Sequence, residues 1–223
     1  MPLTDPSFIG RDRDKATSVD RAYDTVRERL AMLDIRPGAP INDEQLAAEL
    51  GAGRTAVREA LKRLERDRLV IAHPHRGTFA TAVDITDLAD ISEIRIQLEP
   101  AAAARAARTA TAAAREQLAA LAAGIADIGD ADEPRGVLRH DVHVHRAIYR
   151  ASGNPRLEQI LVSLDAHATR IWCLFLDRLP DVVGHARGHV ALLDAIVAGD
   201  EAQAAALTLA HVAGFELAIR ALL

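Results

Sequence analysis

Histidine is concentrated late in the chain, and four residues there have the spacing of a metal site. Of the nine histidines in 223 residues, seven follow residue 139. Asp141 and His145 are four residues apart and would share one face of a helix. His189 and His211 lie at similar distances from the turn sequence at 199–200, so two antiparallel helices would hold them at one height. One carboxylate and three imidazoles suit a divalent cation such as zinc, nickel, manganese or iron.

The same residues also allow simpler interpretations. A single helical histidine is usually a surface group or a satisfied core group. An Asp–His pair four residues apart is often a plain surface contact. His185, one turn before the candidate ligand at 189, is a possible substitute ligand or outer partner, whereas His140 and His143 fall on other faces of their helix and are not expected to bind metal. Tyr149 would form a pocket wall, and the aromatic residues at 172 and 175 are typical of a core.

A basic helix in the first part of the chain has residue types that suit DNA. Arg54 and Arg58 are four residues apart and project from one helix face, which Lys62 continues. Arginine can bind both major-groove acceptors of guanine, and lysine suits phosphate. The turn at 73–77 would bring Arg76, with Gly77 beside it, to the sugar-phosphate backbone or a minor groove. The alternative is an amphipathic helix with a solvated basic face.

The elements that carry the basic residues form a small domain over residues 18–83. Residues 1–17 are polar and contain two prolines, which predicts a flexible N-terminal tail. Apolar residues at helical spacing predict helices over 18–33, 42–51 and 54–68. Extended stretches at 69–73 and 78–83, with a turn between them, predict a hairpin. Three helices and a hairpin in this order indicate a winged helix-turn-helix.

The remaining residues, 84–223, are rich in alanine and leucine at helical spacing, which predicts an all-helical bundle. Together with the first domain this makes the fold class mostly α. Pro100 lies inside one predicted helix, where we expect a kink, and Thr86 is its expected cap. The predicted helices, bounded by glycine, proline and capping residues, are 86–107, 111–128, 133–152, 155–178, 181–198 and 201–222.

Composition narrows the class of protein further. The chain is 49% hydrophobic and carries a net charge of −5, so a buried core is possible and a general polycation is excluded. Its single cysteine, Cys173, excludes an internal disulfide. The most apolar stretch, 100–114, is interrupted by two arginines, so we expect no membrane span and a cytoplasmic location.

The basic segment resembles the winged-helix domain of GntR-type bacterial transcription factors over about residues 18–82. This resemblance implies that Arg54 and Arg58 enter the major groove, and that Thr55 and Lys62 reach bases or phosphates. Glu44 stands where some members have a DNA-contacting arginine, so a contact is not expected there. The segments that carry the resemblance are R-P-G at 36–38, L-A-A-E-L-G at 46–51, R-T-A-V-R-E-A-L at 54–61, L-E at 64–65 and R-G-T-F at 76–79.

The helical part resembles the FCD effector domain of the FadR subfamily of these regulators, over about residues 84–222. The segments that carry this resemblance are D-V-H-V-H at 141–145, S-G-N at 152–154, A-I at 195–196, G-D at 199–200, and the histidines at 189 and 211. It implies that Asp141, His145, His189 and His211 bind a divalent metal that holds a carboxylate ligand. It also implies that Arg95 points into the cavity, the alternative being a surface ion pair between Arg95 and Glu99.

These observations together predict a ligand-responsive transcriptional regulator rather than an enzyme. It would be a homodimeric repressor that binds a palindromic operator in double-stranded DNA, because one recognition helix reads only a few base pairs. Residues 84–223 would bind the metal and a small organic acid effector, in which Arg95 and Tyr149 take part, and would form the dimer. Two alternatives remain open: a metal-dependent hydrolase fused to a DNA-binding module, and a regulator with a purely structural metal site.

Overall fold

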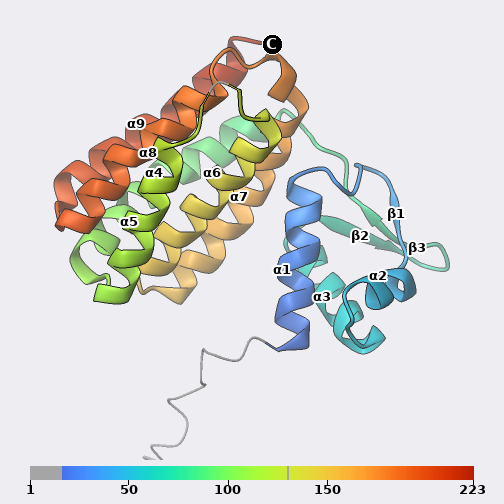
Figure 1. Cartoon of the computed structure of the whole chain (residues 1–223). Helices are drawn as coiled ribbons and strands as arrows, with labels where there is room; N and C mark the ends of the chain where they lie inside the picture. Colours follow the sequence, from blue (N-terminus) through green and yellow to red (C-terminus); the bar gives the residue numbers. More distant parts are fainter. Residues whose placement is uncertain (1–16, 130) are drawn as a thin grey trace, which may run out of the picture. The chain divides into compact units, whose positions relative to one another are not determined.

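The computed structural model describes residues 17–129 and 131–223, so the predicted tail at 1–17 lies, apart from Thr17, outside the described residues. Two compact units divide the chain. The first contains the chain up to Arg29 together with Arg36–Thr81, and the second contains Leu30–Ile35 together with Ala82–Leu223. Within the described residues the structure is mostly helical, as the sequence predicts (Figure 1).

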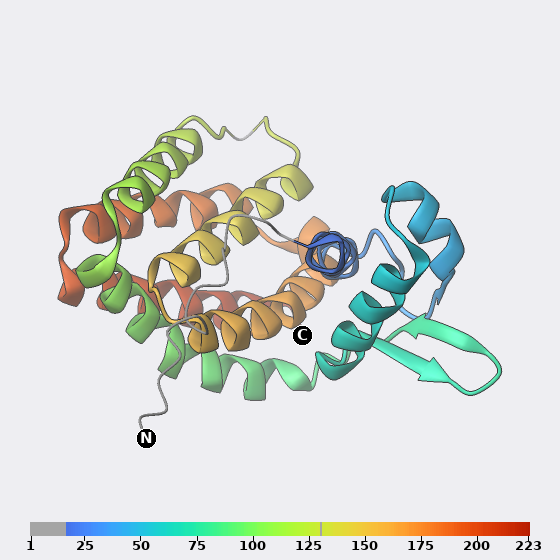
Figure 2. The ribbon, with the colours of Figure 1, turned by 90° about the horizontal axis from the view of Figure 1, so that it is seen from below.

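The first unit is a winged helix-turn-helix. Its helices are α1 (Ser18–Ala31), which continues into the second unit, α2 (Asp43–Glu49) and α3 (Arg54–Arg66). Its strands are β1 (Pro40–Ile41), β2 (Val70–His73) and β3 (Gly77–Ala80), paired antiparallel in the order β1-β3-β2. The β2–β3 hairpin extends from the unit as the wing (Figure 2). The sequence indicated β2 and β3 but not β1, because two residues that include a proline present no strand pattern.

Capping and turn residues fix where these helices begin and end. The Asn42 side chain accepts hydrogen bonds from the backbone N–H groups of Glu44 and Gln45, at 2.9 and 3.0 Å, and so starts α2. Helix α1 ends at Ala31, two residues earlier than predicted, because Leu33 adopts a left-handed conformation with φ of 55°. Arg68, which follows α3, also has a positive φ, 59°, a conformation that costs a non-glycine residue about 1–2 kcal/mol.

The second unit is an all-helical bundle (Figure 2). The predicted bounds are close to the observed ones for most helices, with two differences. Thr86 makes no side-chain capping bond, and the predicted 155–178 helix changes to a 3₁₀ turn after residue 175. Helix α4 continues through Pro100, and the kink expected there stays a prediction. The helices are α4 (Asp87–Thr109), α5 (Ala112–Ala126), α6 (Pro134–Ala151), α7 (Pro155–Phe175), α8 (Val182–Ala198) and α9 (Glu201–Arg220).

Helix α6 separates two apolar clusters and carries polar residues between them. Val137, Val144 and Ile148 pack in a cluster with α4, α5 and α8. Leu138 and Val142 pack in a second cluster with α4, α7 and α9. By helical periodicity, the α6 positions 141 and 145 lie between these two apolar stripes. The fold therefore directs both side chains into the bundle.

Helix α9 corrects one expectation from the sequence. Glu201–Arg220 is long and apolar enough to cross a membrane by length and composition alone, whereas no such segment was expected. In the structure α9 packs along α4 and α8, and its buried residues include Val212, Phe215 and Ile219. An apolar core helix passes the same composition test as a membrane span, so the packing offers a sufficient reason for its composition.

Truncation of Leu193 tests the first apolar cluster. Leu193 is fully buried on α8, so Leu193→Ala should lower the free energy of unfolding by about 2–5 kcal/mol, through lost burial and the cavity left behind. Leu223→Ala, at a position that is 71% exposed, is the matched control and should change it by less than about 0.5 kcal/mol. Urea unfolding followed by circular dichroism measures both. Equal effects would show that Leu193 does not lie in a packed core.

Candidate functional site

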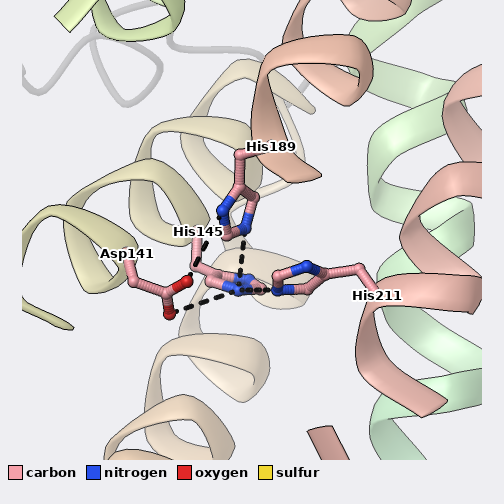
Figure 3. Close-up of side chains that lie close together, drawn as sticks. All are labelled: Asp141, His145, His189 and His211. Carbon is pink, nitrogen blue, oxygen red and sulfur yellow. Dashed lines mark hydrogen bonds and ion pairs between the residues drawn. The ribbon is translucent and has the colours of Figure 1, made fainter. Parts of the chain in front are cut away.

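Four side chains from three helices converge inside the bundle, and we call them the Asp/His cluster. Asp141 and His145 come from α6, His189 from α8 and His211 from α9. Each offers one possible ligand atom, and these atoms all lie within 4.8 Å of one another. Figure 3 shows the side chains pointing toward a common point. The structure thus brings together the four residues that the sequence singled out.

The distances in the Asp/His cluster fit a bound divalent cation. His145 Nε2 lies 3.2 Å from His211 Nε2 and 3.3 Å from His189 Nε2. Two nitrogens that each bind zinc at 2.0–2.1 Å lie about 3.0–3.4 Å apart, so the observed spacing needs little adjustment. Asp141 Oδ1 is buried and has no hydrogen-bond partner. An orphaned carboxylate oxygen beside three imidazoles is a donor set that a divalent metal would satisfy.

Outer contacts leave the Nε2 atoms available. His189 Nδ1 lies 3.1 Å from the Ala186 carbonyl oxygen, to which an Nδ1–H donates. His145 Nδ1 lies 3.2 Å from the Tyr149 hydroxyl and 3.2 Å from Glu99 Oε2. The Glu99 contact has an ion-pair distance but not hydrogen-bond geometry. A proton on Nδ1 directs the Nε2 lone pair inward, which is how histidine ligands are usually oriented.

The histidines of the cluster differ in their affinity for a proton. Burial, together with the charge of the neighbouring His145, lowers the pKa of His189 to about 3. Burial likewise lowers the pKa of His211 well below its usual value. Burial also acts against a charged His145, but the nearby Glu99 carboxylate more than compensates and raises its pKa to about 9. Without a metal, a proton on His145 therefore supplies the positive charge of the cluster.

Arg95 and Glu99 form a buried ion pair on α4. Their side chains are 5% and 1% exposed, and the Arg95 guanidinium contacts a Glu99 carboxylate oxygen. The alternative interpretation of a surface ion pair is wrong, because both side chains face the bundle interior. Burial opposes the charge on Glu99, but Arg95 and then His145 hold its pKa down, at about 2. Glu99 thus links Arg95 to His145 and is a member of the site that sequence reasoning assigned no role there.

A small pocket opens beside the cluster, with a cavity volume of about 10 Å³, which is about the room that one water molecule needs. Arg95 lines it, as the sequence predicted. Tyr149 is not among the lining residues and lies at Nδ1 of His145 instead, so its contribution to effector binding stays a prediction. Asp165, another lining residue, had no sequence signal at all. The lining residues are Arg95, Leu138, Asp141, His145, Asp165, Ala168, Thr169, Trp172, His185, His211 and Phe215.

The structure also places the other histidines and the aromatic residues for which the sequence made a prediction. His140 and His143 are exposed, away from the cluster. His185 is an outer neighbour, with its ring 4.0 Å from that of His211 and its Nε2 3.8 Å from Asp141 Oδ1. Trp172 and Phe175 belong to the second apolar cluster, as predicted, and Trp172 also stacks near His185 with ring centroids 4.4 Å apart.

In the first unit, α3 presents its basic residues on one exposed face. The side chains of Arg54, Arg58 and Lys62 are 51%, 61% and 72% exposed. Arg58 forms an ion pair with Asp43 of α2, and Arg54 lies 3.7 Å from the same carboxylate. Thr55 is exposed at the start of the helix, and Arg76 and Gly77 are exposed at the tip of the wing. The positive φ of Gly77, 92°, is one that favours glycine at this turn.

A winged helix beside an all-helical domain with a buried Asp/His cluster defines a class of bacterial regulatory protein. Residues 18–80 match the family of bacterial regulatory proteins called the gntR family, and residues 90–214 match the FCD domain. The chain belongs to the GntR family, and its helical part is an FCD domain.

Relatives and solved structures agree with this assignment. The chain is 26% identical to a probable D-xylose utilization operon transcriptional repressor of Paenarthrobacter nicotinovorans, over 90% of this chain and 88% of that protein. It is 35% identical to an uncharacterized regulator of Agrobacterium vitis, but over only 46% of this chain and 58% of that one. The fold resembles McbR/YncC of E. coli, with a TM-score of 0.78, 20% identity, and coverage of 93% and 99% of the two chains.

Neutralising Glu99 tests the buried pair. Glu99→Gln keeps the size of the side chain but leaves Arg95 buried without a counter-charge, so the free energy of unfolding should fall by about 3–5 kcal/mol. Arg220 and Glu216 form an exposed pair with the same four-residue spacing, so Glu216→Gln is the control and should cost less than about 1 kcal/mol. Urea titrations of the metal-free proteins compare the two. Similar losses would mean that burial does not strengthen the Arg95–Glu99 contact.

Proposed function

We propose that this chain is a DNA-binding transcriptional regulator whose affinity for its operator is changed by a small carboxylate. The carboxylate would bind in the FCD domain at a divalent metal held by Asp141, His145, His189 and His211. The observation that carries this proposal is the position of one pocket, which is lined by the buried cation Arg95 and by three members of the Asp/His cluster, Asp141, His145 and His211. A divalent metal that takes five or six ligands keeps positions beyond these four side chains, which an anionic oxygen can occupy, and Arg95 lies on the same lining to pair with it.

The first unit would read DNA with α3. Arg54 and Arg58 would contact base edges in the major groove, with Thr55 and Lys62 reaching bases or phosphates, and Arg76 and Gly77 of the wing meeting the backbone or a minor groove. Support comes from the exposure of these residues on the α3 face and the wing. Asp43 would have to release Arg58 for a base contact to form, because both cannot hold the guanidinium at once.

We infer that the protein acts in the cytoplasm as a homodimer on a palindromic operator, and as a repressor. One recognition helix reads a few base pairs, so two copies related by a two-fold axis supply the specificity that one lacks. The FCD domain exposes large apolar side chains that a second copy would cover, among them Ile94 on α4 and Leu209 and Leu217 on α9. The repressor assignment is supported by the name of the Paenarthrobacter relative.

Replacing Arg58 tests the DNA contact. Arg58→Ala should weaken binding to the operator by about 1–3 kcal/mol, which is roughly 5- to 160-fold, if Arg58 contacts a base through two hydrogen bonds. Arg156→Ala removes the same charge from an exposed position in the helical unit and should leave affinity nearly unchanged. Fluorescence anisotropy with operator and random duplexes measures both variants. Unchanged operator affinity in Arg58→Ala would remove this residue from the interface.

A thermal-shift screen of small carboxylates tests the metal-centred pocket. An acid that binds only the folded protein stabilises it by about 2.7 kcal/mol at a hundredfold excess over its Kd. We expect this stabilisation in metal-loaded protein, and its loss after chelation and in His189→Ala. His143→Ala, an exposed histidine on the helix that carries two of the proposed ligands, should behave as the unmodified chain. Stabilisation that survives chelation would contradict the metal's role in holding the acid.

A reciprocal measurement distinguishes a regulator from a metal-dependent hydrolase. If the acid changes DNA affinity by some factor, DNA must change the affinity for the acid by the same factor. The acid should also be recovered unchanged after long incubation with the metal-loaded protein. Steady consumption of the acid would favour the hydrolase. Identical acid affinity with and without operator DNA would refute the coupling between the acid site and the DNA site.

A further inference from the structure

Asp165 is a buried carboxylate that the metal cluster and the DNA face leave unused. It lies on α7, is only 3% exposed, and lines the pocket together with Arg95 and His145. Its Oδ2 atom is buried and has no hydrogen-bond partner. A buried acceptor without a partner loses the hydrogen bonds that water gives it in the unfolded chain. Native proteins seldom keep such an atom, so its presence in the lining of a pocket needs an explanation.

One face of α7 carries a second unpaired group. Asp165, Thr169 and Trp172 are spaced by four and three residues, and all three line the pocket. The Thr169 hydroxyl donates to the Asp165 backbone carbonyl at 2.8 Å, so its proton is already used. Trp172 Nε1 is buried and has no hydrogen-bond partner. This face therefore offers an acceptor and a donor without partners. A bound ligand with a purely hydrocarbon tail would leave both of them unpaired.

Charge limits what can lie against Asp165. Arg95 is already paired with Glu99, and burial raises the pKa of the Asp165 carboxyl. A second carboxylate next to Asp165 would bring two acids together in a medium of low polarity, where at most one ionises readily. A group that donates a hydrogen bond meets no such penalty, whether Asp165 is ionised or neutral, since either form has an oxygen that accepts. The pocket thus disfavours dicarboxylic acids.

We propose that Asp165 selects, among small monocarboxylates, those that carry a hydroxyl or amino group. The carboxylate end lies toward Arg95 and the Asp/His cluster, and the hydroxyl or amino group donates a hydrogen bond to Asp165 Oδ2. A hydroxyl can also accept from Trp172 Nε1. This inference rests on the proposed function, because it assigns the specificity of the same carboxylate pocket.

The test uses zinc-loaded full-length protein and one series of matched probes. The probes are butanoate, its 2-, 3- and 4-hydroxy and amino derivatives, and butanedioate, with binding measured by isothermal titration calorimetry. At least one hydroxy or amino derivative should bind at least about tenfold more tightly than butanoate, because the unmodified acid leaves Asp165 Oδ2 unpaired. Butanedioate should bind more weakly than butanoate.

Two variants test whether Asp165 accepts the hydrogen bond from the hydroxyl or amino group of the ligand. Asp165→Ala should lose the preference for the derivatives while its Kd for butanoate stays within about threefold of that of the unmodified chain. Asp165→Asn keeps an oxygen acceptor but cannot be charged. It should therefore retain a preference for a hydroxyl and lose one for an ammonium group, which identifies the donor. Zinc affinity, measured by competition with a chromophoric chelator, should be equal in all three proteins.

The outcomes distinguish this inference from the function on which it rests. Equal affinity for butanoate and all of its derivatives in the unmodified chain, or an unchanged preference in Asp165→Ala, would overturn the role of Asp165 and leave the carboxylate pocket intact. Reduced zinc affinity in Asp165→Ala would overturn it as well, by making Asp165 part of the metal site. Failure of every acid to bind zinc-loaded protein would overturn the proposed function itself.

Discussion

The helical domain depends on how the Nε2 atom of His145 can lie 3.2 Å from that of His211 and 3.3 Å from that of His189 inside a bundle. Lone pairs that face each other repel, and burial removes the water that would separate them. A shared proton or a bound metal ion removes this repulsion, and a protonated His145 or a metal also brings a positive charge. The fold keeps Glu99 beside His145, so that even the metal-free cluster can hold that charge. The surrounding helices hold the side chains of the Asp/His cluster together and bury most of their surface.

Helix α6 shows how the sequence achieves this. Its apolar residues form two stripes that pack into separate clusters, and the polar residues at 141 and 145 lie between them. A helix with a single apolar face would leave such polar residues at the edge of the core, in solvent. The hairpin of α8 and α9 then supplies the other two ligands from across the bundle. The three helices that carry the Asp/His cluster, which is the proposed cation site, therefore also contribute to the packing of the core.

The sequence predicted those parts of the structure that depend on local spacing. Periodicity located the helices, the turn at 199–200 placed His189 opposite His211, and capping residues such as Asn42 marked helix starts. It failed where tertiary packing decides. The Arg95–Glu99 spacing is the same whether the pair is exposed or buried, so its depth could not be predicted.

Asp165 illustrates the same limit more sharply. Nothing in its neighbourhood along the chain distinguishes it from a solvated residue of an amphipathic helix, and only the packing of α7 places it in the pocket. The sequence did not predict strand β1 for a related reason, since its two residues are extended only because β3 lies beside them. Contacts distant in sequence carry the information that periodicity lacks.

If α3 contacts DNA as we propose, the ion pairs between the α3 arginines and the carboxylates of α2 would affect how the protein searches a genome. In the free protein Asp43 pairs with both Arg54 and Arg58, and Glu44 lies 3.7 Å from Arg54, so these carboxylates partly neutralise the two arginines. Any phosphate that binds these arginines must compete with the carboxylates of α2. A guanine edge would compensate for the broken ion pair with two hydrogen bonds to one side chain. Internal competition of this kind weakens attachment to arbitrary sequences more than attachment to the correct one. This competition would shorten the time that the protein spends bound to DNA other than its operator.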